Sequence, residues 1–202
     1  MRSVDNARQP LRIIVSGGIG SGKTSVTRLL ADRGALVIEA DQIGHDVLEP
    51  GGAAFDQVAG RWPETVVDGR IERWRLAAIV FSDREQLAEL EAITHPLIAA
   101  EIAKRVVGAG SRDVVVELPL AQERADADWT RVVVDAPREI RAVRAVGRGM
   151  DPADVARRLA VQPKRDSWLS HADYVIDNRG SFADLAAQVD ELWATLTSRS
   201  SR

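Results

Sequence analysis

The stretch Val15–Val26, VSGGIGSGKTSV, decides the fold that we expect for the rest of the chain. Within it, Gly17, Gly22, Lys23 and Thr24 fit the pattern G-x-x-x-x-G-K-[ST]. Glycines let the backbone bring its N–H groups close to an anion, and a helix that begins there adds the positive end of its dipole. The pattern therefore predicts a phosphate loop that binds a nucleotide, and it leaves open what is done with the phosphates.

The segments around the phosphate loop have the order strand, loop, helix, strand, which is the context that the pattern requires. The continuous apolar run Leu11–Ser16 suits a strand that is buried on both faces, as in a parallel sheet. A helical spacing of apolar residues follows over Lys23–Arg33, Gly34 ends it, and Ala35–Ile38 is a second apolar run. The alternative, a glycine-rich turn without function, is disfavoured by this context.

Three later apolar runs complete the expected sheet. They are Asp113–Leu118, Thr130–Ala136 and the weaker Ala172–Asp177, and the helical patterns Pro137–Val146, Asp151–Val161 and Ser181–Leu196 lie between and after them. The sequence therefore predicts a P-loop fold of the α/β class, three-layer α/β/α with a five-stranded parallel sheet.

The residues between the second and third expected strands, 42–112, show no good strand pattern. Asp83–Val107 is predicted as a long helix that Pro96 should kink or divide, because proline lacks the N–H that a helix interior needs. A chain of 202 residues fits one domain with a subdomain inserted in it. We therefore expect a single domain, 1–202, with a mostly helical insertion at 42–112.

The overall composition limits the function classes. The net charge of −3 disfavours a general nucleic-acid binder, and the absence of cysteine excludes disulfides, thiolate catalysis and Cys–metal sites. The opening residues, MRSVDNARQP, lack the apolar segment of a signal peptide, and no run of about 18 apolar residues predicts a membrane span. We expect a soluble cytoplasmic protein that binds neither nucleic acid nor membrane.

Carboxylates follow the expected strands at the end where α/β sheets bind ligands. Asp41, after the second strand, could take a proton from a hydroxyl that attacks a γ-phosphate, or it could cap a helix, and its position alone favours neither. Glu39 is a second candidate there. Glu117, at the end of the third strand, could bind Mg²⁺ through water, although its spacing alone slightly favours a solvated strand end.

Arginines are concentrated between residues 138 and 165. Arg141, Arg144 and Arg148 follow a helical spacing, and a mobile flap that carries them could close over ATP. The alternative is a solvated basic helix face, which describes most charge runs. Arg148, which lies between two glycines, is therefore the best candidate among them.

Three function classes remain for a phosphate loop: a phosphotransferase, a nucleotide switch and an ATPase motor. A GTPase switch needs an early DxxG element and a later N/TKxD motif, but Asp177–Gly180 (DNRG) comes near the C-terminus and no NKxD follows it. A motor usually has a clear hhhhDE motif, which this chain lacks. The helical insertion and the arginine-rich segment favour a small-molecule kinase, with the acceptor on the insertion and a lid at about 138–165.

Several motifs make the chain resemble the dephospho-CoA kinase family, which are P-loop kinases similar to nucleoside monophosphate kinases. The motifs occur in the family's order and spacing from about Leu11 to Leu196. They are GGIGSGKT (Gly17–Thr24), EADQIGHDVLEPGG (Glu39–Gly52), GRIERWRLAAIVFSDREQLAELEAITHPLI (Gly69–Ile98), ELPLAQE (Glu117–Glu123), Arg144 with Arg148, Arg158 with Gln162, and ADYVIDNRG (Ala172–Gly180). The phosphate loop alone is not specific for the family, but the segments around His95 and Asn178 are.

The chain departs from the family pattern at several positions. Glu39 and Glu117 stand where the family has aspartate, which moves the charge by one methylene. The acidic residue that usually follows the lid arginine is missing after Arg148, and Trp168 occupies a position where the family usually has lysine. We therefore expect that other positive side chains contribute to binding the phosphates of ATP. The candidates are the basic residues at 164–165.

The resemblance implies a reaction in which ATP phosphorylates the 3′-hydroxyl of the ribose of dephospho-CoA, the last step of CoA synthesis. It implies Asp41 as the catalytic base, Lys23 on the β and γ phosphates, and Thr24 on Mg²⁺. Arg148, with Arg144 near it, would stabilise the transferring phosphoryl group. The expected ATP-binding set is Gly18, Ile19, Gly20, Ser21, Gly22, Lys23, Thr24, Ser25 and Arg144. The expected acceptor-binding set is Asp41, His45, His95 (mainly structural), Glu117, Pro119 and Leu120. The oligomeric state stays open.

Overall fold

The chain divides into two units. The computed structural model describes residues 8–119 and 128–200. One unit comprises Met1–Ile38 and Ala109–Arg202, and the other comprises Glu39–Gly108. Among the described residues, no helix is both long enough and apolar enough to cross a membrane.

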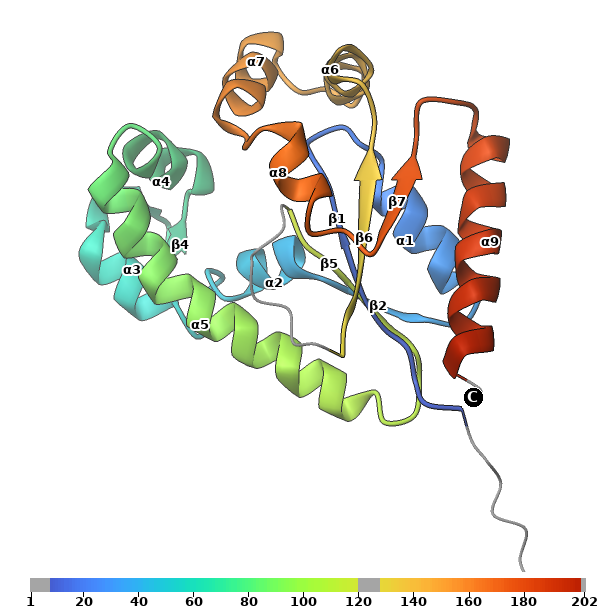
Figure 1. The fold of residues 1–202 in the computed structure, drawn as a ribbon. Coiled ribbons are helices and arrows are strands. Elements are labelled where there is room, and N and C mark those ends of the chain that lie inside the picture. Colours follow the sequence, from blue (N-terminus) through green and yellow to red (C-terminus); the bar gives the residue numbers. More distant parts are fainter. Residues whose placement is uncertain (1–7, 120–127, 201–202) are drawn as a thin grey trace, which may run out of the picture. The chain divides into compact units, whose positions relative to one another are not determined.

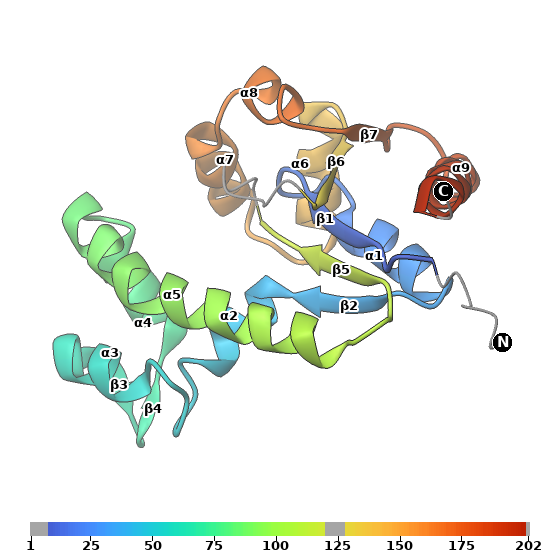
Figure 2. The ribbon, with the colours of Figure 1, turned by 60° about the horizontal axis from the view of Figure 1, so that its bottom comes forward.

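The first unit is centred on a five-stranded sheet with the strand order β2-β5-β1-β6-β7. Its strands are β1 (Arg12–Ser16), β2 (Leu36–Glu39), β5 (Val114–Glu117), β6 (Thr130–Asp135) and β7 (Tyr174–Asp177). β1 pairs in parallel with β5 and β6, β6 pairs in parallel with β7, and Figure 2 shows β2 running in the same direction as β5. The α/β fold with a five-stranded parallel sheet is therefore confirmed.

Aliphatic side chains fill the space between this sheet and two helices, α1 (Lys23–Ala31) and α9 (Phe182–Ser200). The strands are apolar at consecutive positions because both faces of a parallel sheet are covered. Ile13 and Val15 of β1 are fully buried, and so is Val189 of α9. Each such side chain contributes about 1.5–3 kcal/mol when it is buried. This core fixes β1 and α1, the two elements between which the phosphate loop runs.

Three helices connect β6 to β7. They are α6 (Arg138–Gly147), α7 (Pro152–Val161) and α8 (Arg165–Leu169). Asp151 caps α7 by accepting a hydrogen bond from the backbone N–H of Asp154 at 3.0 Å, and Pro152 takes the first helical position. Apolar side chains of α6 and α7 pack together, and Ile19 of the phosphate loop packs against them. These helices therefore adjoin the phosphate loop within the same unit.

The second unit consists of helices and one short hairpin (Figure 1). Its elements are α2 (Ala40–Asp46), α3 (Phe55–Arg61), the 3-10 helix η1 (Pro63–Thr65), β3 (Val66–Val67), β4 (Arg70–Ile71), α4 (Arg73–Val80) and α5 (Arg84–Gly108). β3 and β4 pair in antiparallel around Asp68 and Gly69, which both have positive φ. The sequence showed no good strand pattern in this part of the chain, and the hairpin is only two residues long on each side. Its local signal is the Asp-Gly pair, which favours a tight hairpin turn.

The helix α5 is continuous, with Pro96 inside it. Of the two predicted effects of Pro96, division of the helix is therefore wrong, and a kink stays a prediction. Proline removes a backbone hydrogen bond of the helix, which is a local cost. α5 contacts α2, α3 and α4 along its 25 residues, so tertiary packing holds the helix together on both sides of the proline.

Candidate active site

The phosphate loop contains two glycines whose left-handed backbone no other residue adopts easily. Gly20 has a φ of 73°, and Gly22, the N-cap of α1, has a φ of 101°. A Cβ atom at Gly20 would lie 2.1 Å from the carbonyl oxygen of Arg141, and one at Gly22 would lie 2.1 Å from Nδ2 of Asn178. Conformation and space both demand glycine, so the loop keeps a shape that leaves the first N–H groups of α1 for an anion.

The polar side chains after the glycines connect the loop to β5. Nζ of Lys23 donates a hydrogen bond to the carbonyl oxygen of Gly17 at 3.1 Å. Oγ1 of Thr24 donates to Oε1 of Glu117 at 3.2 Å, and Oγ1 of Thr27 donates to Oε2 at 3.0 Å. Glu117 is half-buried, so it is not the solvated strand end that its spacing slightly favoured. Sequence reasoning missed Thr27, although its i+3 spacing from Thr24 was a usable signal.

Thr24 and Glu117 provide oxygen donors of the kind that Mg²⁺ prefers. Within residues 8–119 and 128–200, no three His, Cys, Asp or Glu side chains are grouped so as to hold a metal ion. Mg²⁺ at this place would therefore take its other ligands from phosphates and water, which is the usual arrangement for this ion at nucleotide sites. The donor set fits Mg²⁺ held together with a nucleotide.

Asn178, directly after β7, connects the phosphate loop to α6. Its Nδ2 donates a hydrogen bond to the carbonyl oxygen of Ser21 at 2.7 Å. The backbone carbonyl oxygen of Asn178 accepts a hydrogen bond from Nη1 of Arg144 at 2.7 Å. Asn178 is buried, and sequence reasoning quoted it within a motif without giving it a role. The structure thus brings Arg144, an expected ATP-binding residue, next to the loop.

Arg141 of α6 is buried against the phosphate loop. Its Nη1 donates a hydrogen bond to Oε1 of Gln162 at 2.9 Å, and its Cζ lies 5.5 Å from the centroid of the Trp168 ring. A Cβ atom at Gly18 would lie only 1.9 Å from Nη1. Burial lowers the pKa of the Arg141 guanidinium, against the opposing effect of the Asp135 charge. Sequence reasoning placed Arg141 among three arginines of a flap that could close over ATP, but it preferred Arg148 as the candidate.

An ion pair between an exposed arginine and a buried carboxylate ties α8 to the sheet. Asp135, at the end of β6, is buried and accepts hydrogen bonds from Nε and Nη2 of Arg165 at 2.9 and 2.6 Å. The hydrogen bond to Asp135, followed by its charge, raises the pKa of Arg165. The sequence made Arg165 a candidate for binding the phosphates of ATP. In the structure, its guanidinium is paired with Asp135. The pair also fixes the position of Trp168, one helical turn further along α8.

Arg148 is the C-cap of α6, and its side chain is exposed. Gly149 follows with a φ of 90°, the left-handed conformation in which helices commonly end. The three arginines spaced along α6 therefore differ, since Arg141 is buried, Arg144 is half-buried and Arg148 is exposed. The role of Arg148 in a lid stays a prediction.

Asp41 and His45 lie on α2, which directly continues from β2. Asp41 is in the first turn of α2 and the N-cap is Glu39, so the alternative that Asp41 caps a helix is wrong. The side chains of Asp41 and His45 are both exposed and lie one helical turn apart. Both are therefore accessible to a ligand.

For the other residues expected to bind the acceptor, the described structure shows few or no contacts. His95 is exposed on α5, and its side chain makes no hydrogen bond or ion pair within the described residues, which gives no support to a mainly structural role. Pro119 is exposed. Leu120 lies outside the residues that the structure describes.

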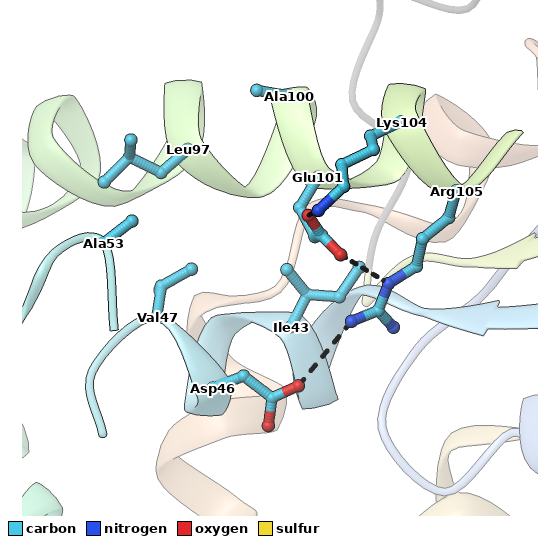
Figure 3. Close-up of a pocket in the computed structure, with 9 residues that line it drawn as sticks. All are labelled: Ile43, Asp46, Val47, Ala53, Leu97, Ala100, Glu101, Lys104 and Arg105. Carbon is cyan, nitrogen blue, oxygen red and sulfur yellow. Dashed lines mark hydrogen bonds and ion pairs between the residues drawn. The ribbon is translucent and has the colours of Figure 1, made fainter. Parts of the chain in front are cut away.

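The unit Glu39–Gly108 contains a pocket of about 360 Å³ between α2 and α5 (Figure 3). Its apolar lining consists of Ile43, Val47, Ala53, Leu97 and Ala100, and its charged lining of Asp46, Glu101, Lys104 and Arg105. Nε of Arg105 lies 2.9 Å from Oε1 of Glu101, and its Nη2 lies 3.8 Å from Oδ2 of Asp46. The charged side chains thus largely neutralise one another, and the apolar wall is the main surface offered to a ligand.

Comparison with known proteins places this site in a family. A family model described as dephospho-CoA kinase matches residues 11–184. The dephospho-CoA kinase of Corynebacterium glutamicum is 42% identical over 197 residues, covering 94% of this chain and 98% of that protein. The crystal structure of TT1252 from Thermus thermophilus has a TM-score of 0.82 at 32% identity, covering 94% of this chain and all of that one.

A more distant structure supports the fold alone. Shikimate kinase from Bacteroides thetaiotaomicron has a TM-score of 0.52 at 14% identity, covering 92% of this chain and 98% of that one. The family model and the 42% identical relative both span the phosphate loop and the residues around it. By this family model and these relatives, the chain belongs to the dephospho-CoA kinase family.

Proposed function

We propose that this kinase transfers the γ-phosphoryl group of ATP to the 3′-hydroxyl of the ribose of dephospho-CoA, giving CoA and ADP. Membership of the family supports ATP-dependent phosphorylation of dephospho-CoA in CoA biosynthesis. The observation that carries the proposal is the hydrogen bond between Thr24 and Glu117 at the base of the phosphate loop. It joins a phosphate-binding loop to a carboxylate at a strand end, which is how P-loop proteins hold Mg²⁺ with a nucleotide. The family then supplies the acceptor to which the phosphate goes.

On the donor side, we assign the β and γ phosphates to Lys23 and to the backbone N–H groups of the phosphate loop. The positive charge of Lys23 offsets the phosphate charge, and the N–H groups orient the chain of phosphates. Arg144, held beside the loop by Asn178, and Arg148 would stabilise the charge of the transferring phosphoryl group. Positioning and charge stabilisation carry most of the rate in phosphoryl transfer.

Thr24, with Glu117 through water, would hold Mg²⁺. When bound, this ion neutralises the oxygens of the β and γ phosphates. The protein's own contribution is to fix two oxygens, Oγ1 of Thr24 and Oε1 of Glu117, 3.2 Å apart. Thr27 holds the other oxygen of Glu117, which sets the orientation of the carboxylate.

On the acceptor side, we assign the general base to Asp41. Its carboxylate would take the proton of the 3′-hydroxyl as that oxygen bonds to the γ-phosphorus and ADP leaves. His45, one turn along α2, would contact the same acceptor. The pocket between α2 and α5 (Figure 3) would receive a part of the acceptor that does not react, because its apolar wall suits an aliphatic chain.

A parallel assay of acceptors tests this proposal. ADP release is measured with Mg-ATP and each of dephospho-CoA, adenosine, AMP and CMP, and the product is compared with CoA to locate the new phosphate. We expect turnover with dephospho-CoA and a 3′-phosphate in the product. Faster turnover with another acceptor would indicate a different small-molecule kinase. ADP release without any acceptor would indicate an ATPase, and tight GTP binding without turnover would indicate a switch.

A further inference from the structure

Arg141 is a buried cation that forms no close ion pair with any described residue. It is 7% exposed, and it forms no ion pair within residues 8–119 and 128–200. The nearby carboxylate of Asp135 is already bound by Arg165. A buried charge without a partner costs several kcal/mol, so proteins rarely keep one without a reason. An anionic ligand beside the phosphate loop would be the missing partner.

The atoms around Arg141 also lack partners. Three buried side-chain atoms make no hydrogen bond to any described residue, and they are Oγ of Ser21, Nε of Arg141 and Nε1 of Trp168. Ser21 belongs to the phosphate loop. The guanidinium of Arg141 lies against that loop, and it stacks on the ring of Trp168. Buried polar atoms normally find partners, so a cluster of exceptions indicates a bound polar group.

The ring of Trp168 belongs to the same cluster. Trp168 is buried, and its only polar side-chain atom is one of the three without a hydrogen-bond partner among the described residues. The Trp168 ring is covered by the guanidinium of Arg141 at 5.5 Å. This distance is within the range of a cation–π contact. The contact holds the guanidinium of Arg141 between the Trp168 ring and the phosphate loop.

We propose that Arg141 is a further ATP-binding residue, whose guanidinium, stacked on Trp168 and held by Gln162, neutralises the triphosphate of ATP at the phosphate loop. The inference rests on the proposed kinase function for the identity of the nucleotide. It differs from the roles assigned to Arg144 and Arg148, which lie one and two turns further along α6. Trp168 and Gln162 are positioning residues that fix the plane of the guanidinium.

The proposal is tested by measuring nucleotide binding without any acceptor. The result therefore does not depend on whether the proposed acceptor, dephospho-CoA, is correct. Dissociation constants for ATP, and for adenosine as a competitor without phosphate, are measured for the wild type and for Arg141→Gln. We expect ATP to bind about 10- to 100-fold more weakly to the variant, as for the loss of a charge-assisted hydrogen bond. Adenosine affinity should change by less than about threefold, because adenosine lacks the charge that the guanidinium meets.

Further variants separate a ligand role from a structural one. Arg141→Gln removes an unpaired buried charge, so the melting temperature without ligand should not fall. Arg141→Lys keeps the charge and should lose less ATP affinity than Arg141→Gln. Trp168→Lys in the Arg141→Gln background places a cation at the neighbouring position 168 and should recover part of the affinity. Arg138→Gln, which removes an exposed arginine one turn earlier on α6, is the matched control and should bind ATP normally.

The proposal is overturned if Arg141→Gln folds and binds ATP within about twofold of the wild type. It is equally overturned if ATP and adenosine lose affinity in the same proportion, because Arg141 would then only support the fold. Should Arg141→Gln not fold, Arg141→Met, which also removes the charge, decides by the same comparison. If Arg141→Lys binds ATP no better than the charge-removing variant, the proposal is also contradicted, because the charge at this position would then make no difference.

Discussion

At the scale of single residues, the most informative side chain is Glu117. Its carboxylate bridges two hydroxyls that lie one turn apart on α1, Oγ1 of Thr24 and Oγ1 of Thr27. The helix spacing of three residues puts both hydroxyls on one face, so a single carboxylate can accept from both. Thr24 is thereby oriented from outside the phosphate loop, by a residue 93 positions away in the sequence.

Replacing Glu117 by glutamine tests this arrangement. Glu117→Gln keeps the shape of the side chain and removes the charge, so Mg²⁺ should bind less tightly to the nucleotide complex. We expect kcat to fall about 10- to 100-fold and the Mg²⁺ concentration for half-maximal rate to rise. A titration of Mg²⁺ at saturating ATP measures both effects. Glu191→Gln, at an exposed position of α9, is the control. An unaltered Mg²⁺ dependence in Glu117→Gln would remove it from the metal site.

Replacing Asp41 by asparagine tests the proposed base. The amide cannot take a proton from the 3′-hydroxyl, and a positioned base contributes about 10²–10⁴-fold to the rate. We expect Asp41→Asn to lower kcat by this factor and to leave the dissociation constant of ATP unchanged. Asp56→Asn, an exposed carboxylate of α3, is the comparison. Normal turnover by Asp41→Asn would assign the proton transfer to another group.

Lys23→Ala should affect the donor as well as the rate. Lys23 lies at the first position of α1, and its ammonium group would offset the charge of the β and γ phosphates. We expect both weaker ATP binding and slower turnover. Calorimetric titration with ATP in the absence of acceptor separates the two effects. Unchanged ATP affinity would show that the phosphates are held by backbone groups alone.

At the scale of elements, the strands were easy to predict and the connections were not. Apolar runs such as Leu11–Ser16 follow directly from burial on both faces of the sheet. The contact of Arg141 with Gly18 joins residues that are far apart in the sequence, so no local pattern could reveal it. The hairpin at Asp68–Gly69 was predictable, because its turn has a local signature that was overlooked.

The continuity of α5 leads to a prediction about stability. Proline in a helix interior costs about 3 kcal/mol relative to alanine when nothing relieves the strain. We therefore expect Pro96→Ala to raise the free energy of unfolding by about 1–3 kcal/mol, measured by urea denaturation followed by circular dichroism. Ala99→Pro, at an exposed position of the same helix, should lower it by about 3 kcal/mol or more. No change in Pro96→Ala would mean that α5 already accommodates the ring without strain.

At the scale of the whole molecule, the two units carry different parts of the proposed reaction. The unit with the sheet holds the phosphate loop, Glu117 and the arginines of α6, and the unit Glu39–Gly108 holds Asp41 and the pocket of α2 and α5. The sequence predicted this division of labour from the family motifs and from the break in strand pattern after the second strand. The pocket itself was not predictable, since its wall combines short segments from α2, from a loop and from α5.

This division predicts that acceptor binding can be changed without any effect on the donor. Ala100→Trp places a large ring on the pocket wall (Figure 3), so the KM for dephospho-CoA should rise about tenfold while the KM for ATP stays constant. Ala99→Trp adds the same ring to the neighbouring exposed position of α5, outside the pocket lining, and should leave both values unchanged. Steady-state kinetics with each substrate varied in turn gives the four constants. If Ala100→Trp raises neither value, dephospho-CoA does not use this pocket; if it raises both, the unit Glu39–Gly108 contributes to ATP binding as well.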